Sequence, residues 1–149
     1  MPLRLARLPL FAVLAIVPLT ACAGPCTLQV HDGWIRKPPA DLPMLAGYAR
    51  IVNDCKAPAV LVSASSPGFA SVGLHATVVE DGISRMREVG EVPIAPGKTA
   101  TFAPGGMHLM LMQPRTPLRA GDMVAIDFTL ADGRSVRGSF EVKGPRAIK

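Results

Sequence analysis

Short runs of β-favouring residues, closely punctuated by proline and glycine, constrain the fold of this chain more than any other feature. The 149 residues include 15 prolines and 14 glycines, and beyond residue 22 no stretch keeps a helical apolar period for three turns. Val, Ile, Leu and Thr instead gather in runs of strand length that end at turn-forming residues. The sequence therefore predicts an all-β protein, an antiparallel β-sandwich of the cupredoxin-like or immunoglobulin-like kind.

Ten strands are expected from these runs, at 27–31, 34–37, 47–53, 59–64, 72–80, 83–89, 99–102, 107–112, 123–130 and 135–142. Asp-Gly steps at 81–82 and 132–133 are typical of tight hairpin turns. The proline-rich stretch 37–43 is expected to form a loop outside any sheet.

Residues 1–22 have the layout of a secretory signal peptide, with Arg4 and Arg7 ahead of a short apolar run at 8–19 and then small residues. The apolar run is too short for a comfortable transmembrane helix. Cleavage after Ala23 is one possible ending. A lipobox at 19–22, which would make Cys22 the lipidated first residue, is favoured because Cys22 has no other evident use. We expect a periplasmic protein, which a lipid on Cys22 would anchor to the membrane.

The rest of the chain, 23–149, is long enough for one domain with a real core and too short for two. Without the signal peptide, 14 basic residues stand against 11 acidic ones, which lowers the formal net charge from +5 to +3. These charges are scattered and form no basic patch interleaved with aromatic residues, so a nucleic-acid partner is not expected.

Cys26 and Cys55 remain as a pair once Cys22 is set aside. In an oxidising compartment two such cysteines are expected to form a disulfide. A pair of thiolate metal ligands is the alternative, but the wide separation and the lack of a CxxC spacing favour the disulfide.

The stretch 107–112, Met-His-Leu-Met-Leu-Met, carries the most distinctive chemistry. Strand side chains alternate between faces, so His108, Met110 and Met112 share one side. An imidazole beside thioethers is suited to a soft metal ion. The alternative is an ordinary buried strand in which methionine fills gaps, as we expect for Met107 and for Met123 of a later strand.

The hairpin at 81–82 supplies two further donors. A two-residue turn pairs Thr77 with Met86 and His75 with Glu88, which makes His75 and Met86 diagonal neighbours on one face. The Cβ atoms of such neighbours lie roughly 7–8 Å apart, so a metal could bind between the imidazole nitrogen and the thioether sulfur. A register slip of one residue would place the two side chains on opposite faces.

Four neutral nitrogen and thioether donors favour Cu(I), whereas Zn(II) more often requires thiolate or carboxylate ligands and Ca(II) requires oxygen clusters. The sequence contains no serine elbow, no carboxylate pair in a recognisable context and no cysteine nucleophile near a histidine, so an enzyme is not expected. A blue-copper centre needs a thiolate beside histidine, and the expected disulfide uses both candidates.

The pattern His75-x10-Met86-x21-His108-x-Met110 resembles the signature of the PCuAC family, periplasmic copper(I) chaperones that serve the binuclear CuA centre of cytochrome c oxidase. All four ligand positions and all three spacings agree. The surroundings are also similar, at 34–36, 66–67, 81–82, 103–106 and 108–111, so the resemblance covers essentially the whole chain after the signal peptide.

This resemblance implies a monomeric cupredoxin-like domain that binds one Cu(I) near the surface and delivers it to subunit II of the oxidase, often alongside Sco-type thiol proteins. Some family members have a His/Met-rich C-terminal extension for a second ion, and residues 143–149 contain no such donors. We therefore expect one site, with weak or no Cu(II) binding.

Two further methionines are candidate auxiliary donors, Met112 on the face of the ligands and Met44 in the proline-rich region, although packing would also explain both. An exported structural or binding lipoprotein, or a copper-storage or tolerance protein without a delivery role, is the alternative function.

Overall fold

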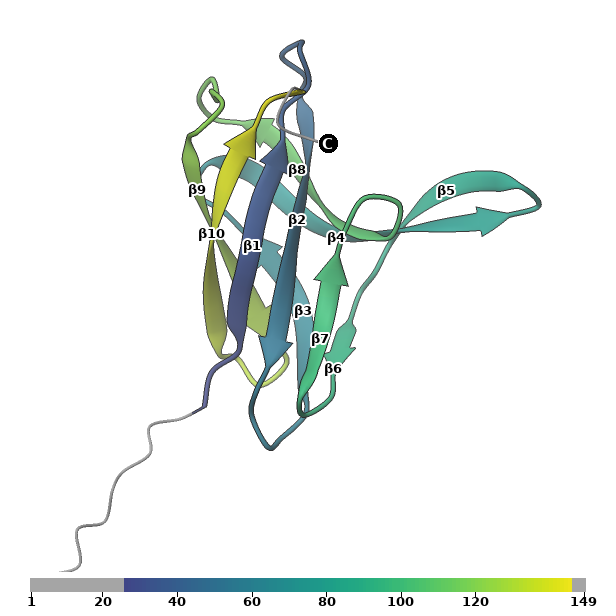
Figure 1. Cartoon of the computed structure of the whole chain (residues 1–149), viewed down its shortest axis with the longest axis vertical. Helices are drawn as coiled ribbons and strands as arrows, with labels where there is room; N and C mark the ends of the chain where they lie inside the picture. Colours follow the sequence, from purple (N-terminus) through teal and green to yellow (C-terminus); the bar gives the residue numbers. More distant parts are fainter. Residues whose placement is uncertain (1–25, 146–149) are drawn as a thin grey trace, which may run out of the picture.

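The computed structural model describes residues 26–145, which form ten strands and no α-helix (Figure 1). The strands are β1 (Gln29–Arg36), β2 (Met44–Asn53), β3 (Ala59–Ser65), β4 (Phe69–Glu80), β5 (Ile83–Glu88), β6 (Val92–Ile94), β7 (Lys98–Phe102), β8 (Met107–Pro114), β9 (Met123–Leu130) and β10 (Ser135–Lys143). No helix among the described residues is long and apolar enough to cross a membrane. The expected signal peptide and Cys22 lie outside the described residues.

The prediction of an all-β protein is confirmed. Strands β2 and β4 begin three residues earlier than expected, at Met44 and Phe69, and two larger differences concern β1 and β6. The expected strands 27–31 and 34–37 form the single strand β1, because a bulge between His31 and Trp34 lets the chain continue in the same sheet. Asp32 adopts a φ of 54° within this bulge. Strand β6 was not predicted, since three residues are too few to show an alternating pattern.

All ten strands belong to one sheet, in the order β5-β4-β8-β7-β2-β1-β10-β9-β3-β6. Two additional pairings, β4 with β3 and β8 with β2, fold this sheet back on itself. Most pairs are antiparallel as expected, but β1–β10 and β7–β8 are parallel. A description as a purely antiparallel sandwich is therefore wrong at these two places. Strands β1 and β10 come from opposite ends of the domain and share three pairs, whereas β7 and β8 share one pair, Phe102 with Met107, beside the turn 103–106.

The interior of the closed sheet is packed with aliphatic and aromatic side chains. Phe69, Phe128 and Phe140 are almost completely buried in it. In β10 the alternation is regular, and its inward residues include Val136 and Val142. Met123, which we expected in the core, is 62% exposed at the first position of β9.

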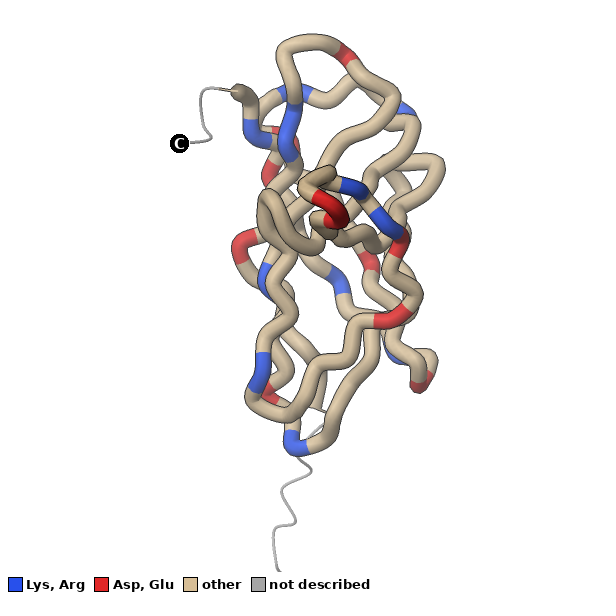
Figure 2. The backbone as a smooth tube through the Cα atoms, turned by 90° about the vertical axis from the view of Figure 1, so that its right-hand side faces the viewer, with Lys and Arg blue, Asp and Glu red and all other residues tan. Residues whose placement is uncertain are grey.

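Strands β4 and β5 form an arm that projects from the body of the molecule (Figure 1). Strand β4 pairs with β8 only as far as Ala76, and beyond that point its ladder partner is β5. Every residue of β5 is exposed. Figure 2, in which the arm faces the viewer, shows acidic and basic residues close together on it. Among them, Glu80 forms ion pairs with Arg87 and Arg85.

Candidate metal centre

The β4–β5 hairpin has the register that the Asp-Gly turn predicts. Thr77 pairs with Met86 and His75 pairs with Glu88. Asp81 and Gly82 both have positive φ angles, 52° and 75°, as a tight two-residue hairpin turn of this kind requires. His75 and Met86 are therefore diagonal neighbours on one face of the arm.

The pairing of β4 with β8 brings the two halves of the pattern together. His75 lies directly opposite His108, and their ring centroids are 6.0 Å apart. Met110 is on the same face of β8 as His108 and lies opposite Gly73 of β4. Two histidines and one methionine thus meet across a single strand pair, at the point where β4 leaves the body and enters the arm.

His108 has one ring nitrogen held by the backbone and the other without a partner. Its Nδ1 lies 3.1 Å from the carbonyl oxygen of Gly106, and because a carbonyl can only accept, Nδ1 carries the proton and donates. The same oxygen accepts a hydrogen bond from the backbone N–H of Thr77 at 3.1 Å. His108 Nε2 is buried and has no hydrogen-bond partner within residues 26–145.

This arrangement suits a metal ligand. With Nδ1 protonated, the lone pair of a neutral imidazole is on Nε2, which is the atom left without a partner. Burying a polar atom without a partner costs about 1–3 kcal/mol, which a bound ion would offset. A hydrogen bond from the second ring nitrogen to a backbone carbonyl is also the usual way in which proteins orient a metal-binding histidine.

A pocket of about 530 Å³ opens beside these residues and is lined by Met86, His108, Met110 and Met44, together with Arg36, Lys37, Pro38, Pro39, Leu45, Ala46, Tyr48, Thr77 and Pro145. His75 is half-buried and lies opposite His108, but it does not line this pocket. The described residues that line it include no carboxylate. Its soft donors are therefore suited to a soft monovalent ion and not to a hard cation such as Ca²⁺.

The two auxiliary methionines are neighbours in the structure. Met44 of β2 lies directly opposite Met112 of β8, on the face that carries Met110. Met44 is 45% exposed and lines the pocket, whereas Met112 does not line it. The side chains of Met110, Met112 and Met44 thus form a row of thioethers from the pocket along β8 to the start of β2.

At the rim of the pocket Lys37 binds Asp41, with 2.6 Å between Nζ and Oδ1. This hydrogen bond and the positive charge of Lys37 lower the pKa of Asp41 below its ordinary value. His31, the third histidine of the chain, is exposed on β1 opposite Arg50 and is separate from the pocket.

Two features of the candidate metal centre could not be predicted from the sequence. The direct opposition of His75 and His108 depends on strands β4 and β8, which are joined through more than twenty residues and carry no turn signal for their pairing. The carbonyl of Gly106 could be suspected only from its place in the Gly-Gly turn before His108.

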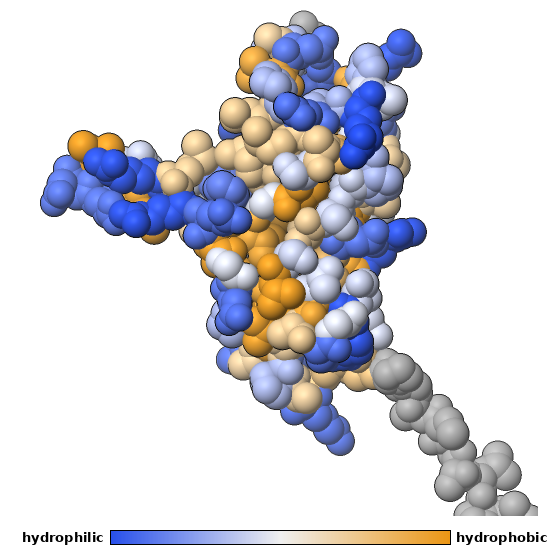
Figure 3. Space-filling view, turned by 180° about the vertical axis from the view of Figure 1, so that it is seen from behind, coloured by the Kyte–Doolittle hydropathy of each residue, from blue (hydrophilic) through white to orange (hydrophobic). Residues whose placement is uncertain are grey.

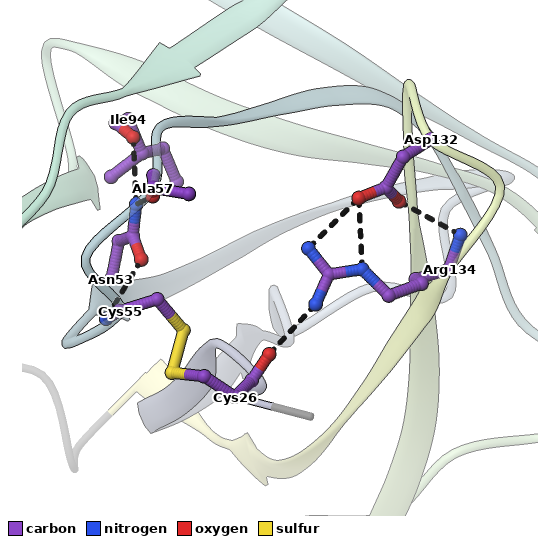
Figure 4. The surroundings of a disulfide bond; sticks show 7 residues. All are labelled: Cys26, Asn53, Cys55, Ala57, Ile94, Asp132 and Arg134. Carbon is purple, nitrogen blue, oxygen red and sulfur yellow. Dashed lines mark hydrogen bonds and ion pairs between the residues drawn. A yellow bond between two sulfur atoms is a disulfide. The ribbon is translucent and has the colours of Figure 1, made fainter. Parts of the chain in front are cut away.

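Cys26 and Cys55 are joined by a disulfide, with 5.7 Å between their Cα atoms (Figure 4). The buried side chain of Asn53 organises this end of the molecule, because it donates to the carbonyls of Ala57 and Ile94 and accepts from the N–H of Cys55. The disulfide leaves no free thiol among the described residues for a copper–thiolate centre.

The family model described as "Putative lipoprotein LpqE-like" matches residues 28–142. "Putative lipoprotein Lxx21020" of Leifsonia xyli is 32% identical over 117 residues, which are 78% of this chain and 69% of that protein. Protein RP573 of Rickettsia prowazekii is 31% identical over 88 residues, 58% of this chain and about half, 49%, of its own length.

Solved structures share the fold. The copper-bound PCuAC domain from PmoF2 superposes with a TM-score of 0.65 at 21% identity, over 79% of this chain and 93% of that domain. The solution structure of the Cu(I) form of DR1885 from Deinococcus radiodurans gives a TM-score of 0.60 at 30% identity, over 83% of this chain and 81% of that protein. The chain therefore belongs to the LpqE-like family of PCuAC-type proteins.

Proposed function

We propose that this protein is an exported copper(I) metallochaperone that binds one Cu(I) through His75, Met86, His108 and Met110. The observation that carries the proposal is the buried Nε2 of His108, which has no hydrogen-bond partner among the described residues, in a side chain that lines a pocket together with Met86 and Met110. Two structural neighbours support it, since one is a copper-bound PCuAC domain and the other, at 30% identity, is a Cu(I) form.

The donor set explains the choice of oxidation state. Thioether sulfur is a soft, uncharged ligand, and a neutral imidazole adds no charge either, so the centre suits a soft monovalent ion. Cu(II) and Zn(II) bind more strongly where thiolate or carboxylate ligands are present. The lining of the pocket provides neither among the described residues.

The unequal exposure of the donors suits transfer to a partner. His108 is 6% exposed, whereas Met86 is 63% exposed on the projecting arm. An incoming ligand can therefore displace the Met86 thioether while His108 still holds the ion. This favours a carrier over an enzyme, because the ion would be released and not retained for a reaction. Met44 and Met112 serve in this proposal as auxiliary donors during the exchange.

Membership of a PCuAC-type family supports a proposal for the wider biological role. The proposed acceptor is the CuA site of cytochrome c oxidase subunit II, reached directly or through a Sco-type thiol protein. We further propose a single cupredoxin-like sandwich domain over 23–149 that acts as a monomer in the periplasm, exported by the signal peptide 1–22 and anchored through a lipid on Cys22. The family description as a lipoprotein supports the anchor.

A competition titration with a Cu(I) chelator under reducing conditions tests the binding step. We expect the wild-type protein to take up one equivalent of Cu(I) and His108→Gln to bind it far more weakly. His31→Gln is the matched control, because His31 is exposed and separate from the pocket. Equal affinity of the wild-type protein and the His108 variant would refute the site.

The delivery step needs a separate experiment. Copper-loaded protein is mixed anaerobically with the soluble domain of an oxidase subunit II, the two proteins are separated, and the copper content of each one reports transfer. Copper that stays on the loaded protein, in the presence of a reduced acceptor, would argue for storage instead of delivery.

A further inference from the structure

Gly73 occupies a special position beside His75. It lies two residues earlier on the same face of β4 and directly opposite Met110 of β8. A Cβ atom at position 73 would lie 2.9 Å from His75 Nε2 and 3.1 Å from His75 Cδ2. The imidazole thus occupies the space that the side chain of any other residue would need, and it lies back along β4 over Gly73.

The usual reasons for a glycine do not apply here. The φ angle of Gly73 is not positive. Apart from the two chain neighbours of Gly73, no described residue other than His75 has an atom within 4 Å of the added Cβ. Gly138 shows the contrast, because a Cβ there would lie 2.6 Å from Cγ1 of the partly buried Val30. At position 73 the imidazole of His75 is the only group in the described part of the chain that requires the space.

We infer that Gly73 is a positioning residue for His75: its missing side chain seats the imidazole against β4, beside Met110 and facing His108. The inference rests on the proposed function and adds a residue that itself has no donor atom. Without this seat the ring would have to turn away from Met110, either into solvent or along the arm, and the centre would have three donors in place instead of four.

The substitution Gly73→Ala tests this seat without endangering the fold. The displaced atoms are the far end of a side chain, and alanine is favoured over glycine in a strand interior. We expect an unchanged or slightly higher melting temperature and a Cu(I) affinity about 10–100-fold weaker, as for other residues that orient a ligand. Gly68→Ala is the control, since its Cβ would meet nothing closer than 3.6 Å.

A double-mutant cycle shows whether the effect acts through His75. In a His75→Ala background, Gly73→Ala should weaken Cu(I) binding no further. In the metal-free protein, NMR should show contacts between the His75 ring and the Met110 side chain that disappear in Gly73→Ala.

The outcomes separate the two proposals. If the wild-type protein binds Cu(I) and Gly73→Ala binds it equally well, or if the loss persists in the His75→Ala background, the positioning role is wrong and the copper site stands. If the wild-type protein binds no Cu(I), the proposed function fails and the inference fails with it.

Discussion

The four proposed donors differ in how firmly the fold holds them. His108 is buried and oriented by the carbonyl of Gly106, whereas Met86 is exposed on the arm. Met110 and His75 are intermediate, half-buried on adjacent strands. This gradient gives each residue a different expected contribution, with the buried donors determining affinity and the exposed one determining the ease of exchange.

Replacing Met110 by leucine removes the thioether while nearly conserving volume. We expect the free energy of unfolding to change by less than about 1.5 kcal/mol. Cu(I) affinity should fall at least about tenfold, which corresponds to about 1.4 kcal/mol. Met123→Leu is the control, because Met123 is 62% exposed on β9 and does not line the pocket. A chelator titration that gives equal affinities for both variants would exclude Met110 as a donor.

Among the elements, the β4–β5 arm has the weakest connection to the body. All of β5 is exposed, and seen from behind the arm is mostly hydrophilic, with hydrophobic residues at its end and hydrophobic surface on the body below its base (Figure 3). The exposed hydrophobic residues of the arm are Val79, Ile83 and Met86. The arm can therefore change locally without unfolding the body, and its turn determines where Met86 lies.

Gly82→Ala tests that dependence, because Gly82 has a φ of 75°, which costs a residue with a side chain about 1–2 kcal/mol. We expect weaker Cu(I) binding, by up to about tenfold, with little change in the melting temperature. Gly133→Ala places the same strain in the other Asp-Gly turn, with a φ of 85°, in the body. This control should lower the melting temperature and leave Cu(I) affinity unchanged; the reverse pattern would contradict the role of the arm.

The β9–β10 pair contains an ion pair with a defined pH dependence. Arg137 lies opposite Asp127, with Nε–Oδ1 and Nη2–Oδ2 distances of 2.7 and 2.9 Å. The hydrogen bond from Arg137 lowers the pKa of Asp127 below its ordinary value of 3.8. The stability that this pair contributes is thus present above pH 3.8 and is lost as the pH falls through the lowered pKa.

Asp127→Asn should therefore lower the free energy of unfolding at pH 7 by no more than about 1 kcal/mol, since the pair is solvent-exposed. The difference from the wild-type protein should shrink below pH 4 and disappear once Asp127 is protonated in both states. Denaturant unfolding at a series of pH values measures this. A difference that stays constant down to pH 2 would show that the loss comes from packing and not from charge.

In the whole molecule the disulfide and the candidate metal centre lie at opposite ends of the closed sheet. Met44 begins β2 at the pocket, and Asn53 ends it beside Cys55, so the nine-residue rise separates them by about 30 Å. Arg134 reinforces the disulfide end by donating to the carbonyl of Cys26 (Figure 4). One end thus stabilises the fold, while the other carries the proposed chemistry.

The double substitution Cys26→Ser and Cys55→Ser should separate these two properties. We expect the free energy of unfolding to fall by about 2–4 kcal/mol, the usual effect of a disulfide. Cu(I) affinity at 25 °C should stay at the wild-type value as long as the variant is folded. Thermal unfolding and a chelator titration on the same samples provide the measurements, and a large loss of affinity would show that the two ends are coupled.

The features that the sequence determined by itself are local ones. The Asp-Gly turn specified the register of the arm, because a two-residue loop leaves a single pairing for His75 and Met86 with their neighbours. Strand alternation likewise placed His108, Met110 and Met112 on one face. Turn residues and strand runs predicted most of the ten strands for the same reason, but they missed the shortest strand, the bulge in β1 and the first three residues of β2 and of β4.

The tertiary structure alone decided how distant segments meet. Strand β8 lies between β4 and β2, which places His75 opposite His108 and Met44 opposite Met112. The tertiary structure also produced the two parallel pairs, the closure of the sheet and the burial of His108 Nε2. Pairings between strands far apart in the chain depend on packing the whole core at once, and no local turn or alternation encodes that choice.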